Sequence, residues 1–230
     1  MEAKVMTPFQ VRVLTTLFES GLRDRDYCFT GGTALAEFYL QHRNSDDLDI
    51  FTRERRSIKA DYLEIKHALE DKALEASSEI EEDEFVRFFV RGAEETGQGL
   101  KIELARYAGA QMSLGTSVER ILVDSFEDIA VNKVCAIHGR SEVKDFVDLF
   151  FILRESEFTL DYLVGRAKEK EADFDREDTV LEFATKLLEV KDFQLHKIRM
   201  IKPLAIEDLQ SFLVSKAEAL IERLRPVGRG

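Results

Sequence analysis

The feature that most constrains the fold is a strand, a double glycine, a helix and a second strand, all between residues 27 and 52. Residues 27–30 (YCFT) form a short β-prone run that ends at Gly31 and Gly32. Residues 33–42 (TALAEFYLQH) are helix formers, and residues 47–52 (DLDIFT) have the alternation of a strand. This order predicts an α/β core with a tight turn between its first strand and the following helix.

The double glycine and the second strand each carry a chemical signal. Gly31 and Gly32 permit a close backbone approach, and the start of the following helix offers N–H groups to a phosphate, although two glycines before a helix are often only a turn. Strand alternation places Asp47 and Asp49 on one face. Two carboxylates among apolar neighbours repel each other unless a cation joins them, and oxygen ligands suit Mg²⁺. Together the two signals predict a nucleotide site.

A third carboxylate comes from a predicted hairpin further along the chain. We expect an opening helix over 7–22, a helix over 58–77, and strands over 85–92 and 100–107 joined by a glycine-containing turn. In the second of these strands Lys101 and Glu103 share one face, and Leu100, Ile102 and Leu104 share the other. If this strand neighbours residues 47–52, Glu103 joins the two aspartates.

Beyond about residue 110 the sequence predicts helices alone. A segment rich in Gly and Ser marks the boundary there. After it we expect helices over 125–139, 143–154, 159–170, 178–190 and 205–225. The predicted class is α+β, with a mixed sheet flanked by helices over 1–110 and an all-helical subdomain over 111–230.

Composition narrows the functional classes. A net charge of −12 argues against a broad basic face that coats nucleic acid, although residues 196–230 hold seven Lys or Arg against four acidic residues. The four histidines are scattered, which argues against zinc. No window of the sequence approaches the roughly 18 apolar residues of a membrane span, so we expect no membrane partner. The two cysteines are not in paired spacings, which suits a reducing compartment, and we expect a cytoplasmic protein.

These motifs resemble the nucleotidyltransferases of the DNA polymerase β superfamily, including the AbiEii/AbiGii-type toxins. The resemblance runs from about residue 28 to 155. Its elements are Gly31-Gly32-Thr33-Ala34-Leu35, residues 42–51 (HRNSDDLDIF), 101–104 (KIEL), 128–130 (DIA), Lys133, 136–137 (AI), 139–140 (GR), 144–146 (KDF) and 148–149 (DL).

The resemblance implies a role for each matched residue. Asp47, Asp49 and Glu103 are implied as ligands of Mg²⁺ (or Mn²⁺), although many relatives carry Asp at the third position. Lys133 is implied to neutralise the triphosphate, and Asp148 to support activity. The implied nucleotide-binding residues are Gly31, Gly32, Thr33, Ser45, Lys133, Arg140, Lys144 and Asp145. The helical subdomain would then complete the nucleotide site.

Three of these residues also have simpler interpretations. Lys144 and Asp148 are spaced i,i+4 and could form only a helical salt bridge. Lys133 lies in an apolar run, 129–138 (IAVNKVCAIH), where an amine needs an acidic partner or a phosphate unless it reaches solvent.

The resemblance also implies substrates and partners. It implies transfer of a nucleoside monophosphate from ATP, GTP, CTP or UTP to an RNA, such as the 3′ end of a tRNA, or to a protein hydroxyl. A toxin–antitoxin or abortive-infection phage defence system, with a cognate antitoxin, is the implied context. The sequence names neither the base, nor the acceptor, nor the oligomeric state.

Other functions remain as alternatives. A catalytically inert nucleotidyltransferase fold that only binds or regulates is the main one, and retention of all three acidic positions and Lys133 weighs against it. The segment 47–52 (DLDIFT) resembles the DxDx[TV] nucleophile loop of haloacid-dehalogenase-type phosphatases, but Phe51 stands where that loop has Thr or Val. A DxD sugar-nucleotide glycosyltransferase is usually longer.

Overall fold

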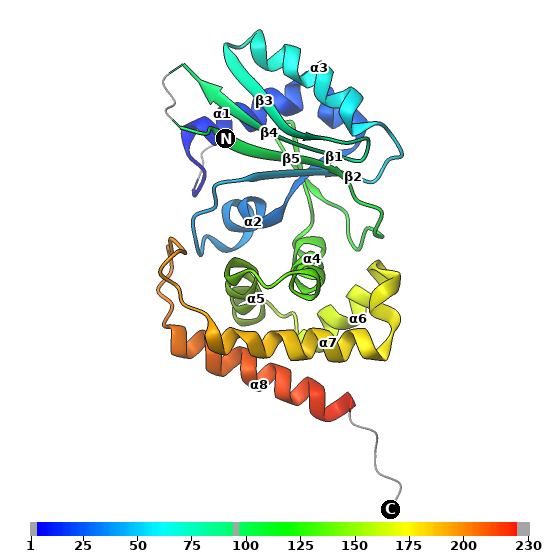
Figure 1. The fold of residues 1–230 in the computed structure, drawn as a ribbon, viewed down its shortest axis with the longest axis vertical. Coiled ribbons are helices and arrows are strands. Elements are labelled where there is room, and N and C mark those ends of the chain that lie inside the picture. Colours follow the sequence, from blue (N-terminus) through cyan, green and yellow to red (C-terminus); the bar gives the residue numbers. More distant parts are fainter. Residues whose placement is uncertain (1–3, 94–96, 225–230) are drawn as a thin grey trace, which may run out of the picture. The chain divides into compact units, whose positions relative to one another are not determined.

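The computed structural model describes residues 4–93 and 97–224, which divide into two compact units (Figure 1). The first unit holds the chain up to residue 109 and residues 114–126, and the second holds residues 110–113 and those from 127 on. A mixed sheet with helices in one unit and helices in the other confirm the predicted α+β class.

The first unit contains all the described strands. Its elements are α1 Pro8–Leu17, a π-helical turn Phe18–Leu22, a 3-10 turn Arg23–Arg25, β1 Tyr27–Thr30, α2 Gly31–Ala34 with a π-helical extension Leu35–Leu40, β2 Leu48–Thr52, α3 Ile58–Glu70, β3 Leu74–Glu81, β4 Phe85–Gly92, β5 Leu100–Arg106, β6 Thr116–Val118 and β7 Ile121–Val123.

Within the described residues these strands form one seven-stranded sheet in the order β3-β4-β5-β2-β1-β7-β6. The strand β2 lies at its centre, antiparallel to β1 and parallel to β5. The register of this parallel pair places Asp49 opposite Glu103. The predicted neighbourhood of the two carboxylate-bearing strands is therefore correct.

One face of the sheet is packed by α3, which lies across β3, β4 and β5 (Figure 1). Leu48 and Ile50 of β2 and Ile102 and Leu104 of β5 are fully buried. The ring of Tyr62 in α3 lies 4.8 Å from that of Phe88 in β4, centroid to centroid. Since side chains alternate along a strand, this packing leaves Asp49 and Glu103 on the opposite face.

The sequence misassigns two segments of this unit. The predicted helix over 58–77 ends at Glu70, and β3 begins at Leu74 after Ala73 adopts a φ of +55°. The expectation of helices alone beyond residue 110 is wrong for β6 and β7, since β7 pairs with β1 through Phe29 and Val123. The predicted turn over 92–99 includes residues 94–96, which lie outside the described residues.

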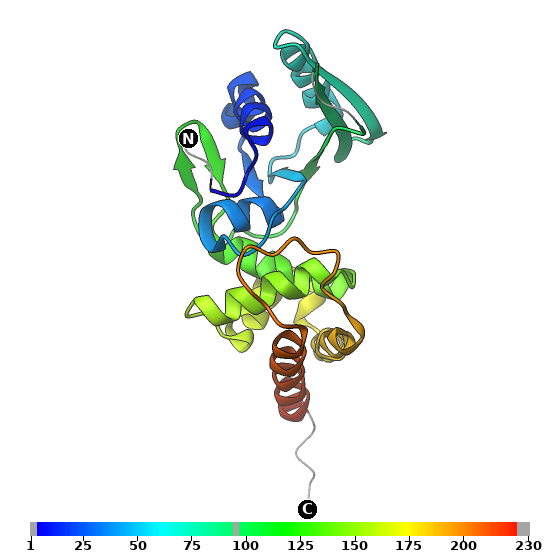
Figure 2. The ribbon, with the colours of Figure 1, turned by 90° about the vertical axis from the view of Figure 1, so that its left-hand side faces the viewer.

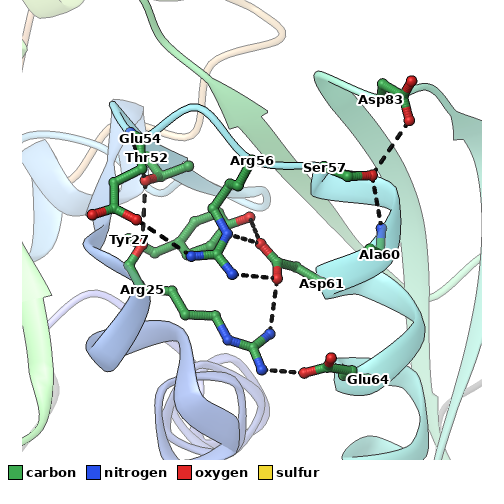
Figure 3. A network of polar contacts seen from close by, with 10 residues as sticks. All are labelled: Arg25, Tyr27, Thr52, Glu54, Arg56, Ser57, Ala60, Asp61, Glu64 and Asp83. Carbon is green, nitrogen blue, oxygen red and sulfur yellow. Dashed lines mark hydrogen bonds and ion pairs between the residues drawn. The ribbon is translucent and has the colours of Figure 1, made fainter.

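A polar network fastens α3 to β1 (Figure 3). The carboxylate of Asp61, which is buried, accepts hydrogen bonds from Arg25 at 2.9 Å, from Arg56 at 2.7 Å and from the hydroxyl of Tyr27 at 2.8 Å. Arg25 also pairs with Glu64. Burial and the neighbouring Asp61 raise the pKa of Tyr27. One carboxylate thus joins helix, strand and the loop before α3.

The second unit contains helices that are joined by turns and by a longer non-helical segment over 193–205. Its elements are α4 Phe126–Gly139, α5 Val143–Glu155, α6 Leu160–Lys170, a 3-10 turn Ala172–Asp175, α7 Glu177–Leu187, a 3-10 turn Leu188–Asp192 and α8 Ile206–Leu224. The predicted helices of this region are confirmed, and only the last predicted position, residue 225, lies outside the described residues.

Aromatic packing and a buried ion pair between α4 and α6 help to hold this unit together. Phe150 of α5 packs against Phe212 of α8 with 5.2 Å between ring centroids, and α7 lies along α8 (Figure 2). Lys170 donates to the carboxylate of Asp128 at 2.7 Å, and both side chains are fully buried. The backbone amides of Met112 and Ser113 donate to the same carboxylate. Asp128 therefore fastens the segment 110–113 to α4 and α6.

Among the described residues, none of the helices combines the length and apolar character that a membrane crossing requires.

Candidate active site

The first glycine of the turn after β1 makes room for a carboxylate. Gly31 has a φ of +74°, a left-handed conformation that residues with a side chain rarely adopt. A Cβ atom placed there would lie 2.7 Å from Cγ of Asp49. The glycine therefore allows the Asp49 carboxylate to sit against the start of α2.

The second glycine makes room for an arginine. A Cβ atom at Gly32 would lie 2.5 Å from a terminal nitrogen of Arg43 and 3.3 Å from Oγ of Ser45. Arg43 is buried and also donates to the carbonyl of Asn44 at 3.1 Å. A guanidinium and a hydroxyl thus lie at the predicted phosphate turn.

Thr33 has a structural hydrogen bond. Its hydroxyl donates to the backbone carbonyl of Asp47, and the side chain is buried. The bond fastens the start of β2 to α2, so Thr33 helps to fix the distance between the glycine turn and the carboxylates.

The three predicted carboxylates lie at neighbouring positions of β2 and β5. Asp49 and Glu103 are register partners, and Asp47 directly precedes β2. The ammonium of Lys101 lies 2.8 Å from Oδ2 of Asp47 and 3.5 Å from Oε1 of Glu103. Arg87 of β4 donates to the same Oε1 at 2.8 Å. The structure therefore brings a cation between two of the predicted metal ligands.

The electrostatics of this cluster favour positive charge. Burial works to lower the pKa of Lys101, but the hydrogen bond that Lys101 donates to Asp47 and the charges of Asp47, Glu103 and Asp49 outweigh it, so the pKa of Lys101 is raised. A positively charged nitrogen already spans Asp47 and Glu103, and carboxylate oxygens are the ligands that Mg²⁺ prefers. The donor atoms are thus of the type that suits a divalent cation, although no three His, Cys, Asp or Glu side chains of the described residues converge closely enough to hold one in this arrangement.

The second unit holds its own charged cluster. The ammonium of Lys133 in α4 lies 2.8 Å from Oδ1 of Asp145 and 2.7 Å from Oδ2 of Asp148, both in α5. All three side chains are buried. Arg140 donates to Asp145 at 2.9 Å from a half-exposed position. Of the two partners expected for Lys133, the acidic one is the one observed.

The charges of this cluster shift the pKa of Asp145. Burial alone would raise the pKa of Asp145, but the positive charge and hydrogen bond of Lys133 and the hydrogen bond of Arg140 hold the pKa below its usual value. Asp145 is therefore ionised at neutral pH, and Lys133 and Arg140 compensate its charge.

In the described part of the chain, Lys144 does not form the helical salt bridge that was its simpler interpretation. The salt bridge considered between Lys144 and Asp148 is absent among the described contacts, because Lys144 pairs with Glu142 at 3.0 Å while Asp148 pairs with Lys133. Glu142 lies 3.4 Å from Arg140 as well. Lys144 and Arg140 are therefore linked through one glutamate on the surface of the second unit.

Sequence reasoning missed two residues that support the carboxylates. Asp124, which follows β7, is buried and accepts a hydrogen bond from Thr30 at 3.1 Å, and Thr30 is the strand partner of Asp49. Arg87 orients Glu103 from the neighbouring strand. Alternation in β4 could have placed Arg87 on this face, but nothing local marks Asp124, because β7 was not predicted.

Comparisons with known proteins agree with these motifs. The family model described as nucleotidyl transferase AbiEii toxin, Type IV TA system, matches residues 12–223. Among solved structures, JHP933 from Helicobacter pylori is similar at 22% identity and a TM-score of 0.60, over 96% of this chain and 95% of its own. MenT4, a nucleotidyltransferase toxin from Mycobacterium tuberculosis, is similar at 14% identity and a TM-score of 0.54, over 93% and 83%. No curated protein matches the chain. At these identities the structures show the fold.

Proposed function

The chain belongs to the AbiEii family of nucleotidyltransferase toxins, and on this premise we propose that it moves a nucleoside monophosphate from an NTP to a hydroxyl acceptor. The observation that carries the proposal is the carboxylate cluster. Asp49 and Glu103 are register partners on adjacent parallel strands, with Asp47 beside them and the turn of Gly31 against Asp49.

The metal end of the site would use all three carboxylates. Asp47, Asp49 and Glu103 would hold Mg²⁺ (or Mn²⁺), and the bound ions would neutralise charge on the transferred phosphoryl group. Arg87 would keep Glu103 turned toward that position through its 2.8 Å hydrogen bond.

The phosphate end of the site would use the glycine turn. Gly31 and Gly32 keep the backbone open to a close approach, and the buried Arg43 and the hydroxyl of Ser45 lie at Gly32. Thr33 would act by fixing α2 to β2 rather than by direct contact, since its hydroxyl is bonded to the Asp47 carbonyl.

The cluster of the second unit would supply positive charge for the triphosphate. Lys133 would neutralise charge that develops on the leaving pyrophosphate. Asp148 and Asp145 hold its ammonium in one place, at 2.7 Å and 2.8 Å. Arg140, which directly follows α4, and Lys144 of α5 would add nucleotide contacts.

The proposal extends to the acceptor and the biological setting. We propose an RNA acceptor, with the 3′ end of a tRNA as the first candidate, because residues 196–230 carry a local excess of three positive charges. A protein hydroxyl is the other acceptor to test. A cognate antitoxin and a role in phage defence complete the proposal.

Incubation of the full chain with Mg²⁺, labelled NTPs, total RNA and a protein extract tests the proposal. Label should enter RNA in a reaction that Asp49→Ala abolishes. Glu75→Ala, which removes an exposed carboxylate of β3 paired with Arg91, should leave it unchanged. Transfer that survives Asp49→Ala would contradict the site, label in protein would contradict the RNA acceptor, and absence of NTP binding would favour the inert module.

A further inference from the structure

The cation between the predicted metal ligands comes from the chain itself. Lys101 reaches Asp47 at 2.8 Å and Glu103 at 3.5 Å, and the three side chains are between 18% and 29% exposed. Such shielding makes the interaction stronger than that of a fully solvated surface pair. An ammonium therefore lies where a divalent ion shared by these two carboxylates would have to bind.

The two cations around Glu103 differ in how firmly they are held. Arg87 is a register partner of Glu103, donates to it at 2.8 Å, and also lies 3.3 Å from Glu79. Lys101 contacts Asp47 and Glu103 through a flexible four-carbon stem that ends in a point charge. Arg87 is therefore held between two glutamates, whereas Lys101 can move away from Asp47 and Glu103 by rotating its side chain.

The position of the ammonium shows why Lys101 would have to leave. It lies 2.8 Å from Oδ2 of Asp47 and 3.5 Å from Oε1 of Glu103, the oxygens that a divalent ion shared by these carboxylates would bind. An ion bound to both oxygens would lie within a few ångströms of the ammonium. Like charges at this separation repel strongly in a partly shielded site.

Building on the proposed function, we propose that Lys101 is a built-in competitor of the metal. In the metal-free protein its ammonium compensates the charges of Asp47 and Glu103. Binding of a divalent ion displaces it from both carboxylates. The site consequently binds free divalent ions more weakly than its three carboxylates alone would.

A charge series at position 101 tests this competition without measuring transfer. Mn²⁺ is titrated into the full-length chain without nucleotide, and free Mn²⁺ is followed by electron paramagnetic resonance. Lys101→Gln and Lys101→Met should bind Mn²⁺ about tenfold more tightly than the unsubstituted chain, because one repelling charge is gone. Lys101→Arg, which keeps the charge, should remain close to the unsubstituted chain.

A matched control separates the local effect from a change in net charge. Lys59 pairs with a glutamate, Glu81, at 3.7 Å. It belongs to α3, which packs on the face of the sheet opposite to the carboxylates. Lys59→Met should leave Mn²⁺ affinity unchanged. Equal or weaker Mn²⁺ binding by Lys101→Gln and Lys101→Met, relative to the unsubstituted chain, would overturn the proposal.

Thermal unfolding gives a second measurement. Without metal, Lys101→Gln should melt at a lower temperature, because Asp47 loses its counter-ion, and Mg²⁺ should raise its Tm by more than it raises that of the unsubstituted chain. An equal Mg²⁺ effect on both would count against competition.

Asp49→Ala distinguishes a failure of this inference from a failure of the proposed function. If Asp49→Ala loses Mn²⁺ binding while the Lys101 variants bind as the unsubstituted chain does, only the competition is wrong. If Asp49→Ala binds Mn²⁺ like the unsubstituted chain, the metal site itself is wrong, and the competition falls with it.

Discussion

Asp49 of β2 and Glu103 of β5 are register partners in a parallel strand pair, so their side chains leave the same face of the sheet at the same level. Leu48 and Ile102, the pair one position earlier, are buried on the opposite face. The apolar residues that bury one face therefore determine where the two carboxylates meet.

Removal of either charge should disable the proposed reaction without unfolding the protein. Asp49→Asn and Glu103→Gln keep the side-chain size but lose a metal ligand, and we expect kcat/KM for nucleotidyl transfer to fall by about a hundredfold or more. Initial rates at several Mg²⁺ concentrations measure this. Tm should change little, and a variant that retains half of the activity would argue against that residue as a ligand.

The sequence predicts these carboxylates because alternation along a strand is a local property. Asp49 and Glu103 could each be assigned to a face from their own neighbours, and Lys101 was placed beside Glu103 in the same way. The contact of Lys101 with Asp47 could not be predicted, because it depends on the register between β2 and β5. Tertiary pairing, not spacing along the chain, decides which charges meet.

The strands that the sequence did not predict were missed for two reasons. The residues of β3 include Leu74, Ala76 and several glutamates, which are good helix formers, and pairing with β4 overrides that preference. The three-residue strands β6 and β7 are too short to show a period. Helices such as α4 and α5 were predicted well because each spans several turns of one apolar pattern.

Gly31→Ala should harm both stability and the metal site. The new Cβ would be strained at a φ of +74° and would collide with the Asp49 carboxylate, so we expect a loss of about 1–3 kcal/mol in the free energy of unfolding and weaker Mn²⁺ binding. Gly97→Ala is the matched control, because Gly97 has a φ of +109° but no atom within 4 Å of a Cβ. Chemical denaturation and Mn²⁺ titration compare them. Equal Mn²⁺ affinity in both variants would contradict the collision.

Asp61→Asn should loosen the first unit far from the carboxylates. Arg25, Arg56 and Tyr27 would lose a shared charged acceptor (Figure 3), and we expect the free energy of unfolding to fall by about 2–4 kcal/mol. Glu64→Gln, which affects only the exposed partner of Arg25, should cost about 0.5 kcal/mol or less. Urea denaturation measures both variants, and equal losses would show that Asp61 is not the central residue of the network.

Lys133→Met should have an effect on stability that depends on pH. Without the ammonium, Asp145 and Asp148 stay buried with less compensation, and we expect a loss of about 3–5 kcal/mol at neutral pH. The pKa of Asp145 is lowered in the folded protein, so its ionised form stabilises the fold above its ordinary pKa, near pH 4. This stabilisation disappears as pH falls below that value, through the lowered pKa.

Burial without the ammonium favours a higher pKa for Asp145 in Lys133→Met. The difference in unfolding free energy between the unsubstituted chain and Lys133→Met should therefore be largest near neutral pH and should shrink as the pH falls toward and below about pH 4. Urea denaturation from pH 3 to pH 7 follows it, with Lys144→Met as a control whose pairing with Glu142 lies at the surface. A difference that does not change between pH 3 and pH 7 would mean that the ammonium does not stabilise the ionised form of Asp145. Since the same ammonium is proposed to neutralise the triphosphate, a shrinking difference would also show that Lys133 keeps its charge within the buried cluster.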